Sequence, residues 1–188
     1  MSTEAISIIV TIALAFIGYL IAYLSSVQTA KRDAQLELIN KRIGEFYGPL
    51  YIATQASRKS FAALLQKLNR SNVLKDPSGP PTEKQLAEWR IWMANVFMPT
   101  NEFIEKLIVE NAYLIQEEEV PECFLQFVTH VSGYRAILNK WQNGDFTEQF
   151  SIIDFPYELD KYAADSYREL KAKQLQLIGK SKPRTKIK

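Results

Sequence analysis

The chain has 188 residues, enough for one domain and an additional membrane segment, and its 47% hydrophobic and 23% charged residues exclude general disorder. Its single cysteine, Cys123, excludes a disulfide scaffold and is consistent with a reducing compartment. The net charge is +2, but the last ten residues carry five positive charges. The remainder therefore carries −3 and lacks the broad basic surface typical of nucleic-acid-binding domains.

Residues 5–24 form an apolar stretch of twenty residues without a charge, preceded by the short N-terminal segment 1–4. A helix of this length spans roughly 30 Å, the thickness of a bilayer core. A cleaved signal peptide would have a positively charged start and a shorter apolar stretch, whereas only Glu4 precedes this one. A buried core helix would usually show a polar face. The sequence therefore predicts a transmembrane helix over 5–24.

The charges around this stretch predict its orientation. No lysine or arginine precedes it, and four follow it closely: Lys31, Arg32, Lys41 and Arg42. The positive-inside rule then places the C-terminal part in the cytoplasm. Tyr19 and Tyr23 lie toward the cytoplasmic end of the stretch, where an aromatic belt is expected. We expect a single-pass protein of the inner (plasma) membrane with a cytoplasmic C-terminal domain.

The helical pattern continues after the membrane as a juxtamembrane helix over 25–48. Gly48-Pro49 should break or kink it, because proline lacks an amide donor and clashes with the preceding turn. A helical bundle over 49–179 follows, with loops at 69–81 and 143–145 and a break at 98–101. Thr82 and Gln85 form a capping-box pattern. The predicted helices of this bundle are 50–68, 83–97, 102–115, 121–141 and 156–177.

The segment 146–155 is short and apolar, and its pattern does not distinguish a helix from an extended segment. With this segment left open, the sequence predicts an all-α fold. An N-terminal transmembrane helix continues into a cytoplasmic bundle of about five or six helices.

Positions at alternating spacings of four and three, as in a coiled coil, connect the membrane helix to the juxtamembrane helix. They are small inside the membrane and large and apolar beyond it, except for Arg32. This pattern favours a parallel homo-oligomer. Alternatively, small residues are simply common in membrane spans, and positions 36–50 face their own domain. The proposed oligomer seam consists of Ala15, Gly18, Ala22, Leu36, Ile39, Ile43 and Phe46.

The residues 180–188 form a basic tail. Its alternating positive charges would suit contact with anionic lipid headgroups, and a solubilising terminus is the other interpretation. The tail contains Lys180, Lys182, Arg184, Lys186 and Lys188.

The chain contains histidine, cysteine and acidic residues, which often act in catalysis or metal binding, but their spacing does not suit either function. His130 follows Cys123 by two helical turns, about 10 Å, which is too far for a thiol–imidazole pair, and the two cannot build a zinc site alone. The acidic run 117–122 and the pair Asp154 and Asp160 are typical of solvated helix ends. The three tryptophans are more typical of a core than of a ligand pocket. We predict no catalytic residue, no metal site and no cofactor.

The stretch Ile43–Tyr51 directly after a single span, together with Phe97–Asn101 and Leu175–Gly179, resembles a pattern in small uncharacterised bacterial inner-membrane proteins. The resemblance implies one span and a helical cytoplasmic domain, and no activity. We expect a non-enzymatic, membrane-tethered module that binds a protein partner or itself. The alternatives are a membrane-perturbing effector, as in phage defence, whose spans assemble on a signal, and an enzyme with an unrecognised carboxylate site.

Overall fold

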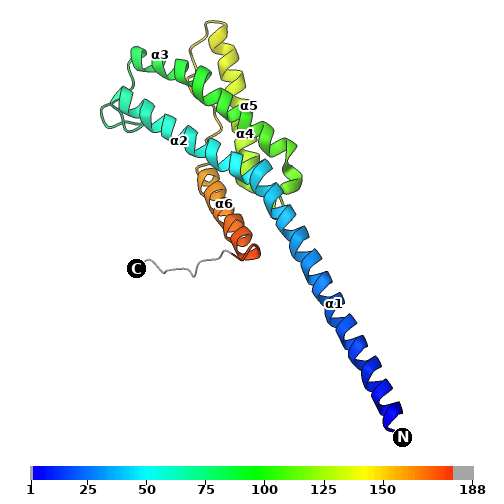
Figure 1. The fold of residues 1–188 in the computed structure, drawn as a ribbon. Helices are drawn as coiled ribbons and strands as arrows, with labels where there is room; N and C mark the ends of the chain where they lie inside the picture. The colour runs from blue at the N-terminus through cyan, green and yellow to red at the C-terminus, as the bar shows by residue number, and fades with distance from the viewer. Residues whose placement is uncertain (1, 180–188) are drawn as a thin grey trace. The chain divides into compact units, whose positions relative to one another are not determined.

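The computed structural model describes residues 2–179, except for the side chain of Ala5. Every regular element in this range is helical, and one isolated bridge pairs Asp76 with Gly79 (Figure 1). The all-α prediction is confirmed. The basic tail, with Lys180, Lys182, Arg184, Lys186 and Lys188, lies outside the described residues.

The chain divides into two compact units, residues 1–40 with 173–188, and residues 41–172. The first unit contains most of α1 (Thr3–Lys41), an unbroken helix of 39 residues and thus roughly 60 Å long. It also contains the last residues of α6 (Glu158–Leu177), where Gln174 Nε2 donates a hydrogen bond of 2.6 Å to Asn40 Oδ1. The N-terminal helix therefore continues past residue 25, as the sequence predicts.

The second unit consists of helices that follow one another with few breaks. They are η1 (Arg42–Tyr47), α2 (Gly48–Leu68), α3 (Glu83–Trp92), η2 (Met93–Phe97), α4 (Met98–Glu110), η3 (Ala112–Leu114), α5 (Glu122–Gln142) and most of α6. Because α3, η2 and α4 are consecutive, they form one long helix. After α1, the described residues thus contain four long helices, rather than the five or six predicted.

Pro99 accounts for this difference, and Pro49 is accommodated in the same way. The residue before each proline closes a widened π-helical turn: the Gly48 amide donates to Ile43 O, and the Met98 amide donates to Met93 O. The wider turn shifts the hydrogen-bond pattern by one residue, so that each proline enters the first turn of the next α-helix, where a missing amide is tolerated. The predicted break at 98–101 is therefore wrong, and at 48–49 the helix continues without a break.

The core of the second unit is aromatic. Phe46 and Tyr47 are fully buried in η1, and the Phe46 ring meets the Phe124 ring edge to face at 5.8 Å. Further fully buried side chains come from α2, α4, η3, α5 and α6: Leu50, Leu64, Ile104, Leu114, Phe127, Val131, Leu159 and Leu170. This unit therefore contains a hydrophobic core of its own.

The predicted loop at 69–81 and the capping box after it are confirmed. Asn69 ends α2 in the left-handed conformation, with φ 52°. Within the loop, Asp76 accepts hydrogen bonds from Ser71 and Ser78, which hold the pKa of its carboxyl below the usual range. The Thr82 side chain accepts from the Gln85 amide, and the Gln85 side chain accepts from the Thr82 amide.

Candidate functional site

The apolar surface of α1 is not covered by the rest of the chain. Its large hydrophobic side chains between Ile6 and Leu24 are 44–69% exposed. In the described part of the chain, α1 and its continuation form the one helix long and apolar enough to cross a membrane. Water-soluble proteins rarely expose a contiguous apolar surface of this size.

The seam residues differ widely in how far their side chains are exposed. Ala15, Gly18 and Ala22 are exposed, and a side-chain carbon at Gly18 would meet nothing within 4 Å. In contrast, Phe46 is 0% exposed and belongs to the core of the second unit.

The remaining three seam residues lie between these extremes. Ile39 is 9% exposed, and Leu36 and Ile43 are half-buried. These residues of the seam are thus wholly or partly covered within one chain. Its small residues, Ala15, Gly18 and Ala22, remain available to a partner, and self-association along the seam stays a prediction.

The cysteine and acidic side chains considered as candidates for chemistry make contacts within the fold. Cys123 is half-buried, and burial raises the pKa of its thiol. Burial likewise raises the pKa of Asp160, against the opposing charge of Arg58. Glu117 accepts a hydrogen bond of 2.8 Å from the Tyr162 hydroxyl, which also lies 3.3 Å from the Tyr47 hydroxyl. Among residues 2–179, no three histidine, cysteine or acidic side chains gather where they could hold a metal ion.

The segment between α5 and α6 is an irregular strap, defined here as residues 146–155. Within the described residues, its backbone makes no hydrogen bond to any other backbone group. An irregular connection this long in a compact domain is commonly functional, because polar backbone groups must find other partners. In this strap, side chains of α5 and α3 provide those partners.

One face of α5 bonds to the strap along its length. The two segments run antiparallel, since later strap residues meet earlier α5 residues. The contacts are Gln126 Nε2 to Asp154 O (3.4 Å), His130 Nδ1 to Ile153 O (2.7 Å) and Trp141 Nε1 to Glu148 O (2.7 Å).

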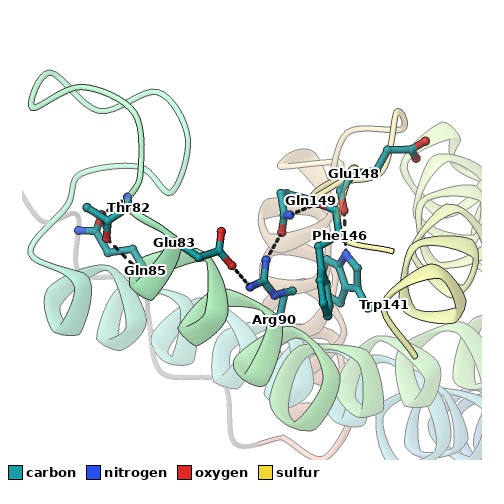
Figure 2. Close-up of polar contacts among 8 residues, drawn as sticks. All are labelled: Thr82, Glu83, Gln85, Arg90, Trp141, Phe146, Glu148 and Gln149. Atoms are coloured by element: carbon teal, nitrogen blue, oxygen red, sulfur yellow. Dashed lines mark hydrogen bonds and ion pairs between the residues drawn. The ribbon is translucent and has the colours of Figure 1, made fainter. Parts of the chain in front are cut away.

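Helix α3 binds the strap through two neighbouring residues. Trp89 Nε1 donates to Gln149 O at 3.0 Å, and Arg90 donates to Gln149 Oε1 at 3.0 Å. Figure 2 shows Arg90 between Gln149 and its ion-pair partner Glu83, and the Trp141 bond to Glu148. The Arg90 guanidinium also lies over the Phe146 ring, 4.5 Å from its centre.

His130 occupies an aromatic cage between α5 and the strap. Its ring lies 4.9 Å from the Tyr134 ring and 5.5 Å from the Phe155 ring. Burial lowers the pKa of His130, although its bond to Ile153 and the charge of Asp154 oppose that shift. Because the Ile153 carbonyl oxygen can only accept, Nδ1 carries the proton in this hydrogen bond.

Gly133 allows the strap to lie directly against α5. A side-chain carbon there would overlap Ser151 Oγ and lie 3.3 Å from Ser151 Cβ. Any larger residue would push the strap outward. The glycine thus marks the closest approach between helix and strap.

An open groove of about 370 Å³ lies next to one end of the strap. Its walls come from α3, η2, α5 and the first residue of the strap: Ala87, Arg90, Ile91, Ala94, Asn95, Leu138, Trp141, Gln142 and Phe146. A second, more polar groove of about 490 Å³ lies between α2 and α6, beside Arg58 and Asp160. Neither groove is enclosed.

The contacts that α3 and α5 make with the strap could not be predicted from the sequence. Trp89 and Trp141 were interpreted as core residues, and burial of 95% and 92% agrees with that, but their indole N–H groups bind strap carbonyls. The available signal was the apolar segment itself, with phenylalanines at 146, 150 and 155 after a glycine-containing helix.

Comparison with protein-family models, curated proteins and solved structures finds no match to this chain.

Proposed function

We propose that the protein is a non-enzymatic interaction module tethered to a membrane, which binds a protein partner or a second copy of itself. The observation that carries this proposal is the uncovered apolar surface of α1, beside a second unit that has its own core. Lipid is the environment in which such a helix is stable. The proposed placement is a single span at 5–24 with the second unit in the cytoplasm, as the basic residues after the span favour.

The placement is tested by fusing reporters after Lys188. A reporter active only in the periplasm is expected to be silent, and a cytoplasmic fluorescent reporter is expected to work and to fractionate with membranes. Deletion of 1–24 should release the fluorescent fusion into the soluble fraction. A membrane-bound fusion after that deletion, or an active periplasmic reporter, would overturn the placement.

Self-association through the membrane helix is the second part of the proposal. In lipid, helices associate by close backbone approach, and Gly18 with Ala15 and Ala22 provides a face of small, exposed residues. Gly18→Ile should therefore weaken assembly of the full-length chain by about tenfold, equivalent to 1.4 kcal/mol. Leu20→Ile, on the opposite side of the helix, is the matched control and should leave assembly unchanged.

The measurement is disulfide cross-linking in membranes. Ala22→Cys in a Cys123→Ser background is expected to form a covalent dimer, which Gly18→Ile reduces. Equal cross-linking at Ala22→Cys and Leu20→Cys would show that the face of small residues is not an interface.

A further inference from the structure

We infer that the face of α3 and α5 that holds the strap is a binding surface for an extended, phenylalanine-containing peptide, which the chain's own strap occupies in this structure. The inference rests on the proposed function, because it names the chemistry of the partner of that interaction module. The partner is a protein segment that replaces the strap.

The first argument is how the strap backbone is held. Side-chain donors from Gln126, His130, Trp141 and Trp89 contact four of its carbonyl oxygens. Grooves that bind extended peptides recognise them in this way, because main-chain groups are present in any sequence and carry the affinity. A segment integrated into the fold would instead share backbone hydrogen bonds with its neighbours, and the strap shares none within residues 2–179.

The second argument is the regular set of aromatic contacts, which would give such a surface its specificity. Phe150 stacks on Trp89, with ring centres 5.1 Å apart and planes 18° apart. Phe155 meets the Phe127 ring edge to face at 5.7 Å. With Phe146 under Arg90, the phenylalanines occur at intervals of four and five residues. A competing segment needs aromatic side chains at similar intervals.

The third argument is that the strap lies on the surface. None of its ten residues is buried: Phe146 is 48% exposed and Ile152 is 96% exposed. The surface beneath it is buried, with Trp89 and Tyr134 5% exposed and Phe127 0% exposed. Departure of the strap would uncover an aromatic surface while the core around Phe46 stays intact.

The test uses a strap that can be locked or loosened in one molecule. Gly133→Cys with Ser151→Cys, in a Cys123→Ser background, places two thiols at the point of closest approach. The 3.3 Å between the carbon positions is near the spacing that a disulfide needs. When oxidised, the strap is fixed to α5. When reduced, two thiols crowd the contact and the strap is loosened.

The probe is a fluorescently labelled synthetic peptide of residues 145–156, added to the full-length protein in detergent. The reduced variant is expected to bind it at least tenfold more tightly than the oxidised variant or the wild type. In those two proteins the tethered strap competes at an effective concentration of about millimolar. A peptide with Phe150→Ser should lose binding, and a peptide with Ile152→Ser, at the most exposed strap position, should retain it.

Three results would overturn the inference. The reduced variant, with native circular dichroism, fails to bind the peptide; the oxidised form binds it equally; or the reduced variant and the separate variant Phe150→Ser both unfold, which would make the strap an inseparable part of the core. None of these results bears on membrane tethering, which the reporter fusions test independently.

Discussion

Phe46→Ala is expected to lower the free energy of unfolding of the second unit by about 3–5 kcal/mol. The Phe46 side chain is 0% exposed and contacts the rings of Tyr47 and Phe124, at 4.8 Å and 5.8 Å between centres. Its removal leaves a cavity that rigid helices close only in part. Since a domain is stable by only about 5–15 kcal/mol, the loss would be large.

Denaturant unfolding of the full-length protein in detergent, followed by tryptophan fluorescence, measures this change. All three tryptophans lie in the second unit, so the signal does not report on the apolar part of α1. Phe103→Ala, at a side chain that is 49% exposed on α4, is the matched control and should change stability by less than about 1 kcal/mol. If Phe46→Ala instead dissociated an oligomer and left the unfolding midpoint unchanged, Phe46 would belong to an interface between chains.

Gly48→Ala is expected to destabilise the second unit by about 1–3 kcal/mol, although alanine is the better helix former. A side-chain carbon at position 48 would lie 2.5 Å from Ile43 O, the carbonyl that accepts the Gly48 amide in the π-turn. The atom in the way is backbone and cannot rotate aside. The substitution must therefore shift the backbone of this turn, where position 48 approaches Ile43 O more closely than a side-chain carbon allows.

Gly44→Ala, in the same turn, is the matched control. Position 44 has nothing within 4 Å of an added carbon, so alanine there should raise stability by up to about 1 kcal/mol. The two substitutions are chemically identical and have opposite expected signs, and the same denaturation experiment measures both. Equal effects at 44 and 48 would contradict the geometry described for the π-turn.

Sequence periodicity predicted the helices well where the local signal was complete. The uncharged stretch 5–24, the capping box at Thr82 and the loop at 69–81 each depend on neighbouring residues, and the structure agrees with each. Local rules failed at Pro49 and Pro99, because they treat a proline as the end of a helix. Whether a π-turn can absorb the proline depends on the tertiary packing of Phe46, Tyr47 and Phe97, which local rules do not contain.

The strap was unpredictable for a different reason. Its conformation follows from side chains more than seven residues away, such as His130 and Trp89, and not from the propensities of 146–155. A side chain on a helix face that donates a hydrogen bond to a distant carbonyl looks the same in the sequence as one that packs in a core. The candidate site therefore emerged only when the fold brought α3, α5 and the strap together.

The two π-turns also determine how this chain can vary during evolution. A π-turn contains one residue more than the α-helical turn it replaces, so 42–47 and 93–97 are places where one residue can be lost and a regular helix restored. Such a deletion would leave the following side chains on nearly the same faces of the helix, because the wider turn accommodates its extra residue within a single turn. Related chains that lack Pro49 or Pro99 are therefore expected to carry a gap of one residue just before that position.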